Sequence, residues 1–425
     1  MKNSSQKIHL LSLLFLFATG HLYSAQDFSN ARSMALGGAY SCLALGAEAP
    51  LYNPGNLSLR TKYPLTVTLL GTGIGLSNNT LNLSLYNRYN GNFLTDASKT
   101  DILNRIPKDG LSVYSVADAH VLGIGYGSLA FTARLKAGLR SSIGRETIDL
   151  LLNGNQLNKV YSFKPISGDE IILGEYAVSY GQKFDLGMKD INHFGVGISV
   201  KYLKGYSYTG TLQSHAQSLT DYSSAEASGR LLANQASGGN GYGIDIGSTV
   251  TFLYRWRASL SIENVFSNLH WNTGTESHAY DFELKATNAD ELFNGHVDTD
   301  SIFVSSDSSF AIPAFNTRLP AILRLGILRA FGRLLIAFEW EQGFENSALA
   351  SKKSLFACGA EYRPLRFFHL RAGTSLGGKF GWANSLGFGF VFGTIRWDFA
   401  ARSFNGFFTP SAHGIGIGTS LIFRY

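Results

Sequence analysis

Apolar residues alternate with small or polar residues, with a period of two, along most of this chain. Near the C-terminus Ile415, Ile417, Phe423 and Tyr425 are apolar, and the positions between them are mostly Gly, Ser, Thr or Arg. Successive side chains of a β-strand point to opposite faces, so this period indicates strands with one apolar face. The same alternation recurs at 131–137, 386–392 and 395–402.

Two arrangements explain strands with one aromatic face. A secreted sandwich buries that face and turns a Lys- and Glu-rich face to water. A membrane barrel turns the aromatic face to lipid and the other face to its lumen. Only 16% of the residues are charged, against roughly 25% in soluble domains, and the second face carries Gly, Ser and charges of both signs. The sequence therefore favours an all-β protein, a transmembrane antiparallel β-barrel, over a soluble secreted β protein.

The N-terminus predicts export from the cytoplasm. Lys2 and Lys7 precede the apolar run 10–18, and Tyr23-Ser24-Ala25 forms a cleavage site, which is the pattern of a secretory signal peptide over residues 1–25. The run is far shorter than the ~20 residues of a spanning helix. Together with a barrel, this signal predicts the bacterial outer membrane.

The chain ends on an aromatic residue of the apolar face. Phe423 and Tyr425 lie two residues apart on that face. This ending resembles the C-terminal strand of outer-membrane barrels, which the insertion machinery reads. The pair is therefore the expected insertion signal.

Loop lengths count and orient the strands, because bacterial barrels have short periplasmic turns and long extracellular loops. The longest connections, at 140–171, 207–240 and 267–316, all fall on one side. A first strand is expected from 64 toward 87, kinked at glycines 71, 73 and 75, and it brings the number of strands to an even fourteen. A short helix near 96–106 is expected in the connection that follows it. Sixteen strands is the alternative, if 79–88 and 111–117 are separate strands. The other thirteen strands are expected at 119–127, 128–139, 172–184, 193–206, 241–254, 256–266, 317–330, 333–343, 354–363, 366–376, 383–392, 394–403 and 413–425.

Residues 31–40 (ARSMALGGAY) and 47–57 (AEAPLYNPGNL) resemble the opening of the fatty-acid-transporter (FadL) superfamily and its PorV relatives. Residues 318–326, 359–364 and 370–373 are similar to uncharacterised members of that group. The resemblance implies that residues 26–63 enter the lumen of a 64–425 barrel as a plug, which hydrophobic ligands pass or avoid by leaving sideways through the wall. The alternative to a transport gate is a plug that only stabilises the barrel. The plug or gate candidates are Gly37, Gly38, Asn53, Pro54 and Gly55.

Many charged residues fall on the face assigned to the lumen. Charge on the lipid face would cost ~2–4 kcal/mol at mid-membrane, so we interpret them as a salt-bridged network between wall and plug. The alternative is that some basic members hold an anionic head group such as a carboxylate. Rings of one sign, which ion-selective pores use, are not evident. The candidates are Arg134, Lys136, Arg324, Glu339, Glu361, His369, Arg371, Arg396 and Asp398, with Glu175, Lys201, Asp245, Glu263, Glu341 and Arg402 on the same face.

The sequence gives no support for an enzyme. Residues 373–377 (GTSLG) match the nucleophile-elbow pattern, but they end a predicted hairpin strand instead of leading into a helix. Cys42 and Cys358 lack the spacing of a zinc site, and no metal or cofactor is expected. The net charge of +6 is spread without a basic run, so nucleic acid is not an expected partner.

These features predict an outer-membrane channel or carrier for hydrophobic or amphipathic compounds. The alternative is a non-transport, PorV-like component of a secretion or surface-attachment system. The expected partners are membrane lipid, a hydrophobic small molecule and the outer-membrane insertion machinery.

Overall fold

Fourteen antiparallel strands close into a barrel in the computed structural model, which describes residues 27–221, 224–287 and 303–425. The barrel closes because β1 pairs with both β2 and β19. The predicted signal peptide lies outside the described residues. In barrel order the strands are β1 (Leu65–Asn78), β2 (Leu111–Tyr126), β3 (Leu129–Ile143), β5 (Ile166–Phe184), β6 (Ile191–Thr220), β8 (Gly238–Phe252), β9 (Trp256–Thr273), β13 (Ile322–Phe331), β14 (Leu334–Gly343), β15 (Leu355–Tyr362), β16 (Phe368–Gly377), β17 (Ala383–Phe392), β18 (Ile395–Phe404) and β19 (Gly414–Arg424).

The count of fourteen is confirmed and the sixteen-stranded alternative is wrong. Residues 111–117 are the first half of β2, which stays paired with β1 from Val113 to Tyr126 without a turn. The predicted strand at 79–88 is replaced by helix α3 (Leu83–Tyr89), whose first turn is capped by the Asn82 side chain. The first strand also ends at Asn78, before the predicted 87, and its ladder shifts between Thr68 and Leu70, ahead of the glycines.

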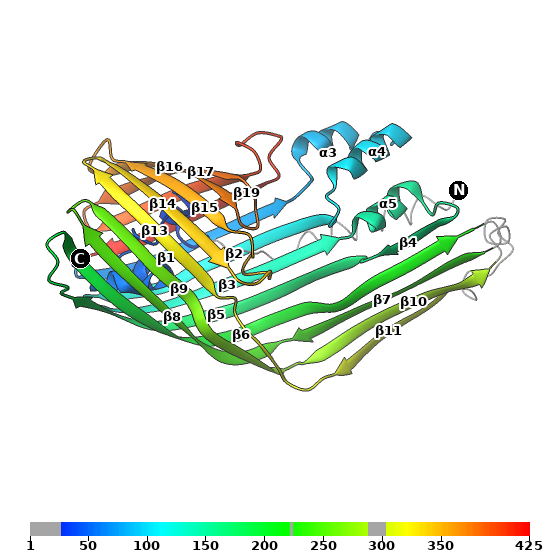
Figure 1. Ribbon diagram of the computed structural model, residues 1–425, viewed down its shortest axis with the longest axis horizontal. Coiled ribbons are helices and arrows are strands. Elements are labelled where there is room, and N and C mark those ends of the chain that lie inside the picture. The colour runs from blue at the N-terminus through cyan, green and yellow to red at the C-terminus, as the bar shows by residue number, and fades with distance from the viewer. Residues whose placement is uncertain (1–26, 222–223, 288–302) are drawn as a thin grey trace.

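Three long connections contain more regular structure than predicted. β5 and β6 continue past the short strands β13–β19, and four strands from the connections pair with this extension or with one another (Figure 1). We call this part the projecting sheet. Helices α3 and α4 (Asp96–Arg105) lie on the same side of the molecule, and α4 matches the predicted helix. The added elements are α5 (Arg145–Asn153), β4 (Lys159–Phe163), β7 (Ala225–Ala236), β10 (Glu276–Thr287) and β11 (Phe303–Ala311), while the short β12 (Phe315–Thr317) pairs with β9.

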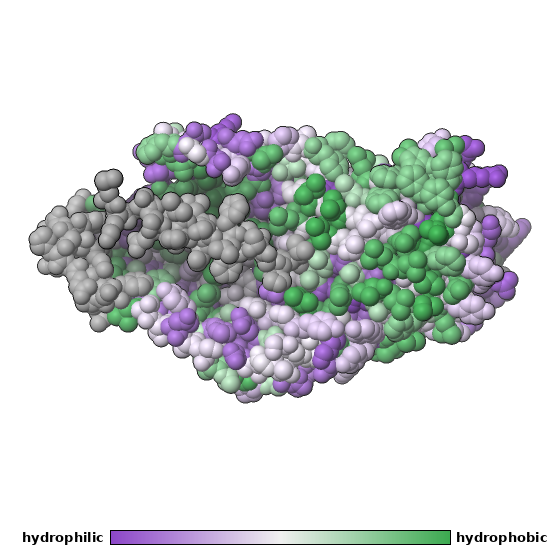
Figure 2. Space-filling view, turned by 180° about the vertical axis from the view of Figure 1, so that it is seen from behind, coloured by the Kyte–Doolittle hydropathy of each residue, from purple (hydrophilic) through white to green (hydrophobic). Residues whose placement is uncertain are grey.

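The outer wall of the barrel is apolar. On β1, Leu70, Ile74 and Leu76 are exposed, whereas Thr68 and Ser77 are buried inside. Figure 2 shows hydrophobic side chains gathered over the barrel part of one face. Such a wall suits contact with lipid, so the alternative of a soluble sandwich, with its aromatic residues inside, is wrong.

No helix in the described ranges is long and apolar enough to cross a membrane.

Residues 27–59 lie inside the barrel, and we call them the plug. They form α2 (Ala31–Ala35) and two short 3-10 helices, η2 (Gly46–Leu51) and η3 (Pro54–Ser58). Asn30 caps α2, because its Oδ1 accepts a hydrogen bond of 3.0 Å from the backbone N–H of Ser33. Nearly every plug residue is buried, so the plug fills much of a lumen that is too wide for fourteen strands to fill with their own side chains.

Candidate functional site

The Gly-Gly segment of the plug lies directly against glycines of the wall. Gly37 has a φ of +72°, a conformation that favours glycine. A Cβ on wall residue Gly359 would lie 2.4 Å from Leu36 O, and one on Gly373 would lie 2.3 Å from Gly37 N. Side chains on either surface would push the plug away from β15 and β16.

The predicted Asn-Pro-Gly turn is seated in the same way on the opposite wall. Asn53 Oδ1 accepts from Gly55 N at 2.9 Å, and Asn53 Nδ2 donates to Ser248 O at 2.8 Å. A Cβ on Gly197 of β6 would lie 2.3 Å from Pro54 C, and one on Gly247 of β8 would lie 2.0 Å from Asn53 Oδ1. Four of the five plug residues singled out in the sequence therefore lie at two contacts between plug and wall. The fifth, Gly38, has a φ of +101° and donates its N–H to Ser33 O at 3.0 Å, which closes the turn after α2.

A chain of alternating charges runs from the plug into the wall. Arg32 Nε of the plug and Arg371 Nε of β16 each donate to Glu361 Oε2 of β15 at 2.7 Å. Arg371 Nη1 then lies 2.9 Å from Asp398 Oδ1 of β18. Glu361 and Asp398 are fully buried, so each depends on these cations for the stability of its charge.

The same chain returns to the plug. Arg396 Nε lies 2.8 Å from Asp398 Oδ2, and Arg396 Nη2 donates to Glu48 Oε1 at 2.7 Å. Glu48 also accepts from the phenol of Tyr40 at 3.1 Å. The chain, which we call the plug–wall chain, thus begins and ends on the plug and joins it to three strands.

A second group of charges, the cross-lumen cluster, connects opposite parts of the wall. Arg134 of β3 pairs with its neighbour Glu175 and reaches Glu263 of β9 at 2.8 Å. Arg324 of β13 lies 2.9 Å from the other oxygen of Glu263 and 3.0 Å from Glu341. Because β3 and β9 are not adjacent, these pairs cross the interior.

The remaining candidates are divided among other contacts. Lys136 joins the cross-lumen cluster through Glu263, at 3.2 Å. Glu339 holds the plug instead, accepting from the backbone N–H groups of Tyr40 and Ser41 at 2.8 Å each. His369 is half-buried and makes no side-chain hydrogen bond or ion pair within the described ranges.

Three further lumen residues belong to neither group: Lys201, Asp245 and Arg402. The run that matches the nucleophile-elbow pattern also lies outside both groups. Lys201 pairs with Asp245 at 2.7 Å, and Arg402 donates to Met34 O of the plug at 3.0 Å. The run 373–377 lies within strand β16, which ends in a turn and not in a helix. It therefore lacks the strand-to-helix geometry of a nucleophile elbow.

An apolar layer lies above the plug, toward the long loops. One cluster of buried side chains contains Phe28 of the plug, Leu269 and Trp271 of β9, and Phe380 and Phe404 near the opposite wall. The rings of Phe380 and Phe404 pack together with centroids 4.5 Å apart and their planes tilted by 32°. Two charged side chains adjoin it at the plug: the Arg402 guanidinium lies 5.7 Å from the centre of the Phe28 ring, and the backbone N–H of Phe28 donates to Asp118 at 2.9 Å.

The connection between β14 and β15, residues 344–354, covers the apolar layer, and we call it the lid. Its buried tip residues Ala348 and Leu349 belong to the layer and contact Gly138 of β3, on the opposite wall. The Ala348 N–H donates to Asp169 of β5, and Lys379 donates to Ala348 O. The lid therefore crosses the lumen and is fastened on its far side.

The wall beside the apolar layer is interrupted. β9 pairs with β12 at Leu269 and with β13 only from Glu263, so residues 318–321 make no strand ladder. Ser267 Oγ bridges part of the gap, accepting from Leu319 N at 2.9 Å and donating to Leu319 O at 3.1 Å. Leu319 itself belongs to the apolar layer. Side-chain hydrogen bonds thus replace backbone pairing at this point.

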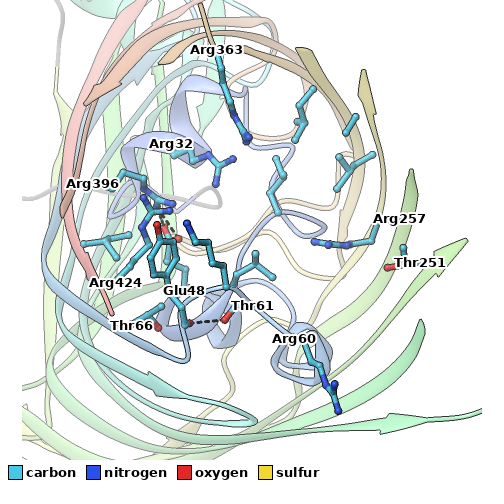
Figure 3. A pocket seen from close by; sticks show the side chains of 18 of the residues that line it. Arg32, Glu48, Arg60, Thr61, Thr66, Thr251, Arg257, Arg363, Arg396 and Arg424 are labelled. Carbon is cyan, nitrogen blue, oxygen red and sulfur yellow. Dashed lines mark hydrogen bonds and ion pairs between the residues drawn. The ribbon is translucent and has the colours of Figure 1, made fainter. Parts of the chain in front are cut away.

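The end of the barrel formed by the short turns contains a cavity of about 510 Å³, which we call the vestibule (Figure 3). Eight basic side chains and one acidic side chain, Glu48, line it. The sequence pattern did not reveal this concentration of one charge sign, because five of the basic residues fall in the plug linker, in turns or at strand ends. These five are Arg60, Lys62, Arg255, Arg257 and Arg424.

Comparison with known proteins identifies the fold. Residues 54–222 match a family of unknown function (DUF5723), and no curated protein matches the sequence. The structure is similar to the Ralstonia pickettii toluene transporter TbuX, with a TM-score of 0.53 and 15% identity over 94% of this chain and 99% of that one.

Two further solved structures share this architecture. The CymD monoaromatic hydrocarbon channel has a TM-score of 0.51 and 14% identity over 94% of this chain and 99% of its own. A Pseudomonas aeruginosa FadL homologue has a TM-score of 0.50 and 12% identity over 95% of this chain and 100% of its own. The chain therefore has the fold of FadL-type barrels, as the plug motifs predicted.

Proposed function

We propose that this chain, with its FadL-type barrel, is a channel of the bacterial outer membrane for small hydrophobic compounds. The observation that carries the proposal is the apolar layer, which extends inside the lumen from the plug to the lid. Barrels that pass water-soluble solutes have polar interiors. A layer of packed aromatic and aliphatic side chains inside the lumen favours apolar compounds instead.

The unpaired segment of the wall is a candidate exit from the lumen for a hydrophobic compound. Leu319 lies both in the unpaired segment 318–321 and in the apolar layer. A hydrophobic molecule that enters beneath the lid could leave there into the membrane without crossing the two charged groups. The toluene transporter and the monoaromatic hydrocarbon channel of the same fold support small aromatic compounds as the first to test.

Flux of toluene and glucose into proteoliposomes tests this proposal. The full chain should raise toluene flux above that of protein-free vesicles, and replacing 346–352 with a short Gly-Ser linker should raise it further. Glucose flux should stay at background in both cases. The same replacement in the exposed segment 91–94 is the matched control, because that segment does not contact the apolar layer.

Absence of toluene flux even without the lid, or an equal flux of glucose, would contradict the proposal. Stable co-purification of a secreted or surface protein, combined with absent flux, would favour the PorV-like alternative.

A further inference from the structure

The vestibule holds more positive charge than its surroundings neutralise. Of its eight basic side chains, Arg32 and Arg363 pair with Glu361, and Arg396 pairs with Glu48 and Asp398. Within the described part of the chain, the other five make no ion pair with a carboxylate: Arg60, Lys62, Arg255, Arg257 and Arg424.

These five cations line one opening. Figure 3 places Arg257 and Arg424 on opposite sides of it and Arg60 at a third side. Arg257 is fixed by a hydrogen bond of 2.8 Å from its Nη1 to Cys42 O, and the Arg424 guanidinium lies 5.2 Å from the centre of the Tyr63 ring. Like charges that line one cavity raise the free energy of the empty site, and a bound anion would lower it.

Two of the guanidinium groups also have an N–H donor without a hydrogen-bond partner among the described residues. The Nε atoms of Arg257 and Arg424 are buried, yet neither has a hydrogen-bond partner among the described residues. A buried donor without an acceptor is costly, so both atoms favour a ligand that brings acceptor oxygens.

The rest of the lining suits an organic body. Leu43 and Leu45 of the plug, Leu328 and Leu335 of the wall, and the indole of Trp256 face the same cavity. Its volume of about 510 Å³ falls within the range of ordinary small-molecule sites.

We infer that the vestibule is a binding site for an organic phosphate, reached from the short-turn end of the barrel. Arginine forks match phosphate oxygens in pairs, and a phosphate monoester supplies about −1.5 to −2 charges with three acceptor oxygens. The phosphate could belong to a soluble ester or to a lipid head group, since both present the same chemistry. This inference does not depend on the hydrophobic channel, because the plug separates the vestibule from the apolar layer.

Calorimetric titration of phenyl phosphate into the full chain, in neutral detergent, tests the inference. Phenyl phosphate should bind and phenol should not. The triple variant Arg60→Gln, Lys62→Gln, Arg255→Gln should weaken binding about tenfold or more, and it should fold normally because all three side chains are exposed. The charge-matched control is Lys183→Gln, Lys189→Gln, Arg366→Gln, which changes exposed residues of the same end outside the cavity and should leave the affinity unchanged.

Nanodiscs distinguish the two sources of the phosphate. If phosphatidic acid in the disc abolishes phenyl phosphate binding that phosphatidylcholine discs permit, the natural ligand is a lipid head group; if binding persists in both, it is a soluble ester. Failure of phenyl phosphate to bind in detergent and in phosphatidylcholine discs would overturn the inference. Equal binding of phenol, or equal weakening by the control variant, would overturn it as well. Toluene flux is a separate readout and should be normal in the triple variant.

Discussion

The two ends of the lumen differ in chemistry although the same strands build them. At the long-loop end, an apolar layer is covered by a lid that crosses to the opposite wall. At the short-turn end, the vestibule is open and lined by eight basic residues. The plug lies between them, held by buried charges and by glycine contacts.

This difference shows how a plugged barrel can present two unlike surfaces at once. Burying Glu361 and Asp398 requires paired cations, and the plug supplies Arg32 for one of them. The charged groups therefore serve as the boundary that separates the apolar end from the basic end. Breaking the ion pairs that hold the plug should therefore connect the apolar end of the lumen with the basic end.

The largest expected effect concerns which end faces the cell surface. In a background without Cys42 and Cys358, a cysteine at Gln213 of the projecting sheet should react fully with a membrane-impermeant maleimide on intact cells. One at Lys189, in a short turn, should react only after the outer membrane is opened, although both positions are exposed. Reversed labelling would invert the assignment of the two ends.

Glu361→Gln should loosen the plug. It removes the charge that Arg32, Arg363 and Arg371 share, and loss of one partner of a buried pair costs about 3–5 kcal/mol. We expect a lower unfolding temperature by heat-modifiable gel migration and a higher ion conductance in planar bilayers. Glu226→Gln, at an exposed site in β7, should change neither. Wild-type behaviour of the Glu361 variant would show that the plug–wall chain does not hold the boundary.

Gly373→Ala should also loosen the plug and destabilise the protein, but less than Glu361→Gln. The new Cβ would lie 2.3 Å from Gly37 N, so the plug must shift, at a cost of about 1–3 kcal/mol. Gly174→Ala is the matched control, because its Cβ meets only side-chain atoms at 3.3 Å or more. Equal stability of the two variants in a denaturant titration would argue against close seating of the plug.

The most local expected effect is a pH dependence of the lid. Burial lowers the pKa of Lys379 from 10.5 to about 7 when the lid is docked, with Asp169, Arg140, Glu341 and Lys136 as the charged groups facing it. The docked lysine therefore loses its proton more easily than a free one. As pH rises from about 7 toward 10.5, the equilibrium constant for docking should increase by up to about tenfold per pH unit. Below pH 7 the lysine is protonated in both states, so docking should not change further.

Trypsin cleavage after Lys352 or Lys353 of the lid, corrected for the enzyme's own pH profile, measures this dependence. Cleavage should slow as pH rises from 7 to 9 in the wild type. Lys379→Met should abolish the slope. A slope that survives in the variant would assign it to another group.

The sequence predicts the wall better than the ends. Strands β14–β19 match their predicted bounds within two residues, because tight turns such as Phe392-Gly393 separate runs with a clear apolar face. The predicted strand 317–330 is wrong at its start, because β13 begins at Ile322 and residues 318–321 are unpaired. The projecting sheet was missed because β7 has no continuous apolar face: its stability comes from pairing with β6 and β10 on both sides. Pairing between distant polar strands leaves no local pattern to read.

The charged candidates show the same limit. Alternation assigns Glu361 and Arg371 to the lumen, but not the partner Arg32, which lies 329 residues before Glu361. The vestibule is even harder to predict from the sequence. Arg60 lies in a linker and Arg255 in a turn, where alternation assigns no face. Closure of the barrel brings them together.

Locking the lid tests the central claim, passage of hydrophobic compounds beneath it, most directly. A Cβ on Gly138 would lie 3.3 Å from the Cβ of Ala348, close to the ~3.5–4.5 Å of a disulfide, so the pair Gly138→Cys, Ala348→Cys should cross-link the lid to the far wall. Toluene flux into proteoliposomes is measured before and after reduction, with each single variant as control. We predict background flux when the pair is oxidised and recovery on reduction. Unchanged flux through the locked barrel would contradict the account.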